Sequence, residues 1–106
     1  MEEIDGLEVD LDRLPPELRQ LAPTIREWAM IDAESRDARL EDASTEDLAR
    51  FWLDVSPELP AINAYLEAAI EGEESTEAIA LAATAEGALE AAAIVERRTG
   101  QHPTAG

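Results

Sequence analysis

Apolar residues recur every three or four positions along most of the chain, a spacing typical of amphipathic helices. The clearest example starts at Ser44, which precedes two acidic residues and can cap a helix. Leu48, Phe51, Trp52 and Val55 then form one apolar stripe. This segment predicts a helix that ends at the Ser-Pro pair directly after the stripe.

Two helical segments are expected before it. The first is a short helix over about residues 15–21, and the second begins near Pro23, because a proline fits the first turn of a helix but interrupts its interior. Residues 33–40 are mostly polar. Two alternatives therefore stay open there: Asp32 caps a fresh helix, or the preceding helix continues.

Two helical segments are expected after it. The first has two prolines at its start, so it begins between residues 57 and 60, and Gly72 is a suitable left-handed stop. The second is capped by Ser75 or Thr76, reaches about Arg98 and is stopped by Gly100. This last helix is either a core helix or a surface that pairs with a second copy of the chain.

The pattern predicts an all-α fold, a compact bundle of four to five helices with short loops. Residues 1–12 are expected to form an acidic arm, either extended on the bundle or disordered, residues 13–99 a single helical domain, and residues 100–106 a flexible tail. The expected core consists of Leu18, Leu21, Ile25, Trp28, Leu48, Phe51, Val55, Ile62, Leu66, Leu81, Leu89 and Val95.

The net charge of the chain excludes several classes of function. The 106 residues include 25 acidic and 8 basic ones, for a net charge of −17, and there is no cysteine. A basic groove for phosphates cannot be built from so few arginines, so direct binding of nucleic acid or of an anionic membrane is disfavoured. The start of the chain is acidic and no run of about 18 uninterrupted apolar residues occurs, so we expect no membrane span and a cytoplasmic location.

Catalytic patterns are sparse. The one histidine, His102, lies in a Pro/Gly-containing tail, and there is no lysine, so no base is available for a nucleophilic triad. The run Glu73-Glu74-Ser75-Thr76-Glu77 reads E-E-x-x-E, half of the magnesium signature of all-α nucleotide pyrophosphohydrolases. The other half, E-x-x-D, is absent because no aspartate follows Asp54. We therefore expect no enzyme and assign no catalytic, cofactor-binding or metal-binding residue.

The remaining signal is an acidic surface. No basic residue occurs between Arg50 and Arg97, whereas ten acidic residues do. We expect these residues to form a continuous negative face. Two interpretations stay open: the face binds a basic protein, or it only keeps the chain soluble. The expected partner-binding residues are Asp54, Glu58, Glu67, Glu71, Glu73, Glu74 and Glu77.

The sequence thus favours a non-enzymatic protein-interaction module that docks a basic partner, and an immunity or antitoxin-like inhibitor is one form of it. Two alternatives stay open. A DNA mimic would compete for the phosphate sites of a nucleic-acid-binding protein, and a magnesium-dependent nucleotide hydrolase would use the E-E-x-x-E run.

Three stretches carry a resemblance: Leu14–Pro23, Glu41–Leu48 and Ala61–Leu66. Together with the all-arginine, alanine-rich usage, they resemble small acidic proteins of unassigned function from high-GC actinobacteria. The similarity covers about residues 10–70. It implies a helical bundle, and it transfers no catalytic residue because the shared positions are caps and core residues.

Overall fold

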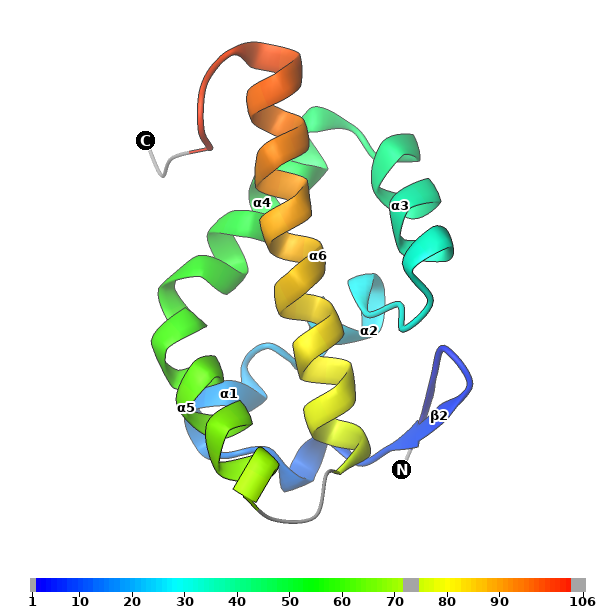
Figure 1. Cartoon of the computed structure of the whole chain (residues 1–106), viewed down its shortest axis with the longest axis vertical. Coiled ribbons are helices and arrows are strands. Elements are labelled where there is room, and N and C mark those ends of the chain that lie inside the picture. The colour runs from blue at the N-terminus through cyan, green and yellow to red at the C-terminus, as the bar shows by residue number, and fades with distance from the viewer. Residues whose placement is uncertain (1, 72–74, 104–106) are drawn as a thin grey trace.

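The computed structural model describes residues 2–71 and 75–103, and it confirms an all-α bundle. The longest helix, α6 (Thr76–Thr99), runs along the long axis of the molecule, and the other elements gather around it (Figure 1). It contacts α2, α3, α4, α5 and the strand β2. The core therefore lies along α6.

The acidic arm forms a β-hairpin, which the sequence analysis did not expect. β1 (Glu2–Ile4) pairs antiparallel with β2 (Leu7–Val9) around a two-residue loop. In this loop Asp5 and Gly6 both have positive φ, 48° and 85°, which is the backbone of a type I′ turn and favours an Asp-Gly sequence. Val9 is fully buried, so the arm packs onto the bundle.

The N-terminal helices are short. A 3₁₀ turn (Leu11–Arg13) leads to α1 (Pro16–Arg19) and α2 (Ala22–Trp28). The sequence left open whether the helix before Asp32 continues or a new one starts there. The carboxylate of Asp32 accepts a hydrogen bond of 2.9 Å from the backbone N–H of Ser35. Asp32 thus caps a fresh helix, α3 (Ala33–Asp42).

The C-terminal helices begin where the capping residues predicted. Ser44 caps α4 (Thr45–Val55), and Ser75 caps α6. Between them, the 3₁₀ turn η2 (Ser56–Glu58) is followed by α5 (Leu59–Glu71). The α-helix α5 therefore starts inside the interval of residues 57–60 that its two prolines left open.

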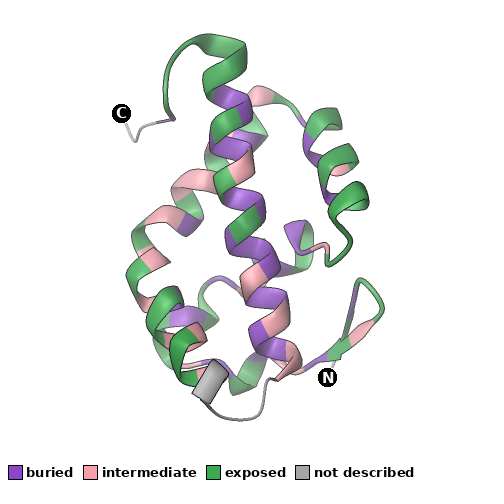
Figure 2. Ribbon diagram, in the orientation of Figure 1, coloured by how far each residue is buried: buried purple, intermediate pink, exposed green. Residues whose placement is uncertain are grey.

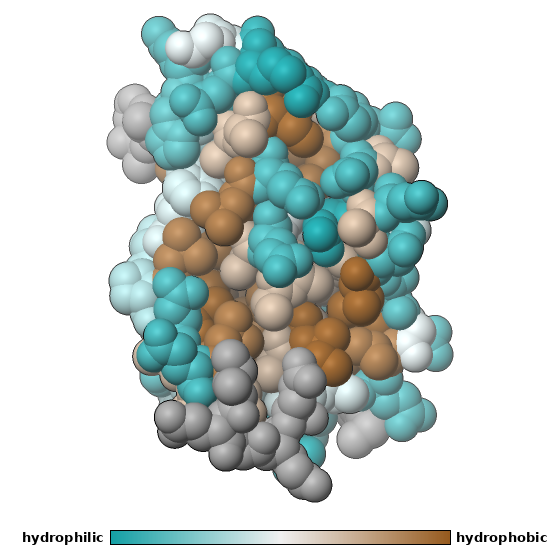
Figure 3. All heavy atoms as spheres, in the orientation of Figure 1, coloured by the Kyte–Doolittle hydropathy of each residue, from teal (hydrophilic) through white to brown (hydrophobic). Residues whose placement is uncertain are grey.

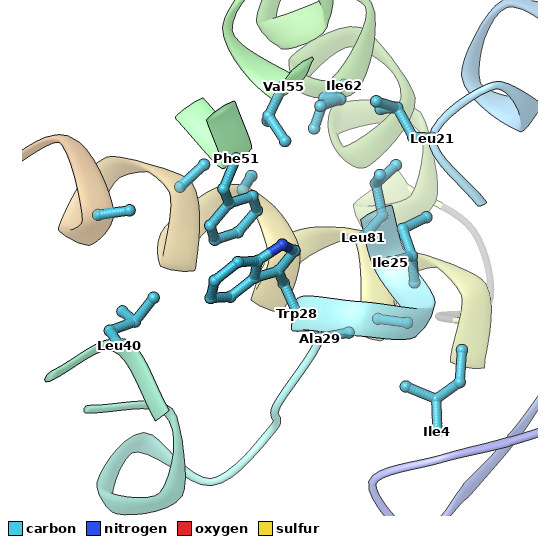
Figure 4. Close-up of a cluster of buried hydrophobic side chains, with 14 of the residues drawn as sticks. Ile4, Leu21, Ile25, Trp28, Ala29, Leu40, Phe51, Val55, Ile62 and Leu81 are labelled. Atoms are coloured by element: carbon cyan, nitrogen blue, oxygen red, sulfur yellow. The ribbon is translucent and has the colours of Figure 1, made fainter. Parts of the chain in front are cut away.

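The core is centred on an aromatic pair. The rings of Trp28 and Phe51 stack with their centroids 4.6 Å apart and their planes 4° from parallel (Figure 4). The predicted core residues are buried with two exceptions: Leu66 is half-buried, and Leu89 is 53% exposed. The expectation for Leu89 was wrong because α6 buries a different face. The confirmed core residues are Leu18, Leu21, Ile25, Trp28, Leu48, Phe51, Val55, Ile62, Leu81 and Val95.

Helix α6 is long and apolar enough to cross a membrane by length and composition alone, which the search for an uninterrupted apolar run did not detect. However, 67% of its most apolar window is buried inside the bundle (Figure 2). A central core helix passes the same test. The helix by itself is therefore weak evidence for a membrane location.

The tail expected to be flexible folds back where the structure describes it. Gly100, with a φ of 76°, ends α6 in the left-handed conformation, as predicted. The ring of His102 then packs edge-on against Trp52, with centroids 5.4 Å apart, and Pro103 is buried. Residues 104–106 lie outside the described residues.

Candidate functional site

An open groove lies where the end of α4 and the turn η2 meet the junction of α1 and α2. Its volume is about 410 Å³. Two of the predicted partner-binding residues, Asp54 and Glu58, lie on its wall. We call it the acidic groove, and its lining residues are Gln20, Leu21, Pro23, Thr24, Leu53, Asp54 and Glu58.

Helical geometry explains why the two carboxylates lie together. Phe51 and Val55 face the core, which turns Asp54 toward solvent. Pro57 fits the first turn of η2, so the chain keeps a helical path after α4. Glu58 therefore comes one turn after Asp54, on the same side of the chain.

A second, smaller hollow adjoins the acidic groove and shares Asp54 with it. Its volume is about 40 Å³, and it lies between α2 and α4. Both aromatic residues of the stacked pair line it, together with four charged residues. The lining residues are Glu27, Trp28, Asp47, Arg50, Phe51 and Asp54.

Most of the acidic side chains that line these two hollows have no ion-pair partner among the described residues. Glu27 forms an ion pair, with 3.8 Å between its Oε1 and Nη2 of Arg39. Within residues 2–71 and 75–103, no basic group lies within 4.0 Å of the carboxylates of Asp47, Asp54 or Glu58. The acidic groove therefore carries negative charge that the described part of the chain does not neutralise directly.

Arg50, the arginine that lines the smaller hollow, forms an ion pair within its own helix. Arg50 Nη2 lies 3.6 Å from Oε1 of Glu46, one helical turn earlier on α4. Both side chains are largely exposed, so this pair is weak and leaves the local balance of charge negative. The lining thus combines carboxylates, polar side chains and the apolar side chains of Leu21 and Leu53.

The other predicted partner-binding residues do not join the acidic groove. Glu67 is exposed on α5 but does not line it. Glu71 ends α5, and its side chain is not described, while Glu73 and Glu74 lie outside the described residues. The expectation for Glu77 was wrong, because this residue is only 3% exposed and cannot present its carboxylate to a partner.

The burial of Glu77 follows from the spacing of residues along α6. Glu77, Leu81, Thr84 and Ala88 recur at intervals of four, three and four, so they share the buried face of the helix. This finding also weakens the reading of E-E-x-x-E as a magnesium motif. In the part of the chain that the structure describes, no three His, Asp or Glu side chains gather as metal ligands do.

A buried arginine was missed by the sequence analysis. Arg36 on α3 is 8% exposed, and its Nε donates to Oε2 of Glu90 at 3.0 Å. Its Nη2 lies 3.5 Å from Oε2 of Glu86, and its Nη1 donates to the carbonyl oxygen of Met30 at 3.2 Å. The hydrogen bond to Glu90 raises the pKa of Arg36 above its ordinary value.

A glycine in α6 marks the place where this arginine packs. A Cβ added at Gly87 would meet two ring atoms of Phe51 at 3.4 Å and the Cδ of Arg36 at 3.5 Å. A glycine between two glutamates in a helix was the available signal, because it suggests the close approach of a neighbouring element. Arg36, Glu86 and Glu90 thus link α3 to α6, and none of the three residues lines the acidic groove.

No protein family model, no curated protein and no solved structure matches this chain. The resemblance to actinobacterial proteins therefore stays a prediction. The acidic groove is the feature of the described chain that brings predicted site residues, Asp54 and Glu58, together.

Proposed function

We propose that this chain is a non-enzymatic acidic interaction module that docks a basic partner protein at the acidic groove. The observation that carries the proposal is that Asp54 and Glu58 line one groove without a cation within 4.0 Å in the described residues. Carboxylates in this state attract a partner's arginine or lysine, which also relieves their mutual repulsion.

The groove has the composition that a long basic side chain needs. Pro23 and Leu53 offer apolar surface to its methylene stem, and the carboxylates of Asp54 and Glu58 accept hydrogen bonds from its charged head. Arginine fits best, because its planar guanidinium can donate two parallel hydrogen bonds to one carboxylate.

The charge of the whole chain supports the same partner. A net charge of −17 on 106 residues projects a field that accelerates encounters with positively charged proteins. Charge of this kind sets the rate and the selectivity of capture, while the groove supplies a place where the partner is held. The combination suits an inhibitor that has to bind a basic protein quickly.

The experiment is affinity capture from a lysate of the source cell at about 50 mM and about 500 mM NaCl. Three baits are compared: the wild-type chain, the groove variant Asp54→Asn/Glu58→Gln, and the control variant Glu34→Gln/Asp42→Asn. The control removes the same charge from two exposed positions on α3, outside the groove. All three baits are checked for equal helix content by circular dichroism.

We expect one basic protein to be held by the wild-type and control baits at low salt, released at high salt, and depleted on the groove bait. The proposal is overturned by an empty capture, or by proteins that the groove and control baits retain equally. The identity of the captured protein separates two forms of the module. A basic toxin makes it an immunity-like inhibitor, and a nucleic-acid-binding protein that loses its DNA makes it a DNA mimic.

A further inference from the structure

Helix α6 has a second periodic face, opposite the one it buries. Ile79, Ala82, Glu86, Leu89 and Ala93 recur at intervals of three, four, three and four. All five are exposed or half-buried, and we call them the outer seam. Intervals of three and four are the spacing at which one helix presents side chains to another that lies along it.

The outer seam is set apart from the core by helical geometry. It is displaced by two residues from the buried positions that start at Glu77, a rotation of about 200° around the helix axis. In Figure 1, no described element is drawn over the side of α6 that faces the viewer. The outer seam also shares no residue with the acidic groove.

Leu89 is the apolar centre of this seam. It is 53% exposed, and Ile31, at 36%, is the other large apolar side chain that is exposed among the described residues. Ala82 and Ala93 lie one to two turns away on either side, and their small side chains allow a partner helix to approach closely. Figure 3 shows hydrophobic atoms along α6, interrupted by hydrophilic atoms near its middle.

The charges around the outer seam favour a basic helix as its binding partner over a second copy of this chain. Glu86 lies in the seam and Glu90 beside it, and both carboxylates are held by the one guanidinium of Arg36, which leaves a net charge of −1. α5 and α6 carry no basic residue before Arg97. A second copy of this chain would bring acids against acids, whereas a basic helix would meet opposite charge.

We propose that the outer seam docks an amphipathic helix of a basic partner protein. The helix inserts apolar side chains around Leu89 and places arginine or lysine opposite Glu86 and Glu90. This is a second interaction surface, which binds through apolar contact and charge together, and it goes beyond the acidic groove, where charge dominates.

The test uses two synthetic peptides of about 21 residues, three heptads long. One places leucine at every a and d position with arginine at the flanking positions, and the other has the same composition in scrambled order. Dissociation constants are measured by fluorescence anisotropy at about 150 mM NaCl. Comparing the two peptides removes the attraction that any cationic peptide has for this chain.

Wild-type protein should bind the amphipathic peptide about tenfold more tightly than the scrambled one. Leu89→Ser should abolish most of this preference and leave the affinity for the scrambled peptide unchanged. The matched control Ile31→Ser, at the other exposed apolar side chain, should retain the preference. The groove variant Asp54→Asn/Glu58→Gln should also retain it, which separates this proposal from the proposed function.

Equal affinities for the two peptides overturn the proposal, as does a preference that survives Leu89→Ser. Sedimentation of the wild-type chain without peptide gives a further check. A dimer that Leu89→Ser dissociates would assign the seam to a second copy of the chain and so would also overturn the proposal. A monomer is the expected result, because repulsion between chains of net charge −17 opposes self-association.

Discussion

The guanidinium of Arg36 on α3 donates a hydrogen bond of 3.0 Å to the carboxylate of Glu90 on α6, 54 residues further along the chain. The arginine side chain is 10% exposed and the glutamate side chain 41% exposed. The contact therefore lies at the edge of the core, where the arginine is buried and the glutamate is partly exposed to solvent. On α3 the only other buried residue is Leu40, so Arg36 is the one charged side chain of this helix that is buried against the bundle.

We predict that Arg36→Met destabilises the fold by about 1–3 kcal/mol, because the variant loses the hydrogen bonds to Glu90 and to the carbonyl of Met30 while keeping an apolar stem. Glu90→Gln should cost less than about 1 kcal/mol, since glutamine still accepts a hydrogen bond and the site is partly screened by water. Urea unfolding of the three proteins gives both values. Equal losses in the two variants would contradict this asymmetry.

The stacked pair at the centre of the core should be energetically coupled. Trp28 and Phe51 lie face to face, and the guanidinium carbon of Arg39 lies 4.2 Å from the centre of the Trp28 ring on α2. In a double-mutant cycle of Trp28→Leu and Phe51→Leu, we expect a coupling of about 0.5–1.5 kcal/mol beyond the loss of each side chain alone. Additive losses would show that the rings fill space without a specific interaction.

The cap of α3 should make stability depend on pH in the acid range. The backbone N–H and the hydroxyl of Ser35 donate to Asp32, and these hydrogen bonds lower the pKa of its carboxyl group in the folded chain. A lowered folded pKa means that the stabilisation is complete above the ordinary value of about 3.9 and is lost as the pH falls through the folded value. Asparagine also caps a helix but does not titrate.

The corresponding measurement compares wild type with Asp32→Asn by urea unfolding at about pH 6 and about pH 2.5. Wild type should be the more stable protein at the higher pH, and the difference should shrink at the lower pH. A difference that is constant or that grows on acidification would exclude the proposed cap as its source.

Salt should stabilise this protein. The net charge of −17 makes repulsion between acidic groups larger than the gain from the exposed ion pairs, most of which have at least one largely exposed partner. Raising NaCl from about 20 mM to about 500 mM screens that repulsion. The Tm measured by circular dichroism should therefore rise, and a falling Tm would mean that the ion pairs dominate.

Local signals in the sequence predicted most of the helices correctly. Ser44 was identified as a cap, Ser75 as one of two possible caps and Gly100 as a stop, because each acts through its own backbone geometry. The hairpin was missed, although Asp5-Gly6 between apolar residues is a strong hairpin signal. A two-stranded hairpin has little stability alone, and here it packs on α6, a contact that periodicity does not reveal.

The functional surfaces were harder to predict than the helices. Charge alone pointed to Asp54 and Glu58, but the groove around them requires the α1–α2 junction to pack against α4, which only the tertiary structure provides. The buried face of α6 could not be predicted from the pattern, because alanines occur on all faces of this helix. For that reason Glu77 was expected at the surface and Leu89 in the core.

The most direct test of the docking account is a calorimetric titration of the captured basic protein with wild-type chain, with Asp54→Asn/Glu58→Gln and with Glu34→Gln/Asp42→Asn, each at about 50 mM and about 300 mM NaCl. The account predicts that the groove variant binds at least about tenfold more weakly than wild type at low salt and responds less to added salt, while the α3 variant stays within about twofold of wild type. Equal weakening by the two double variants would contradict it, because binding would then follow net charge and not the groove.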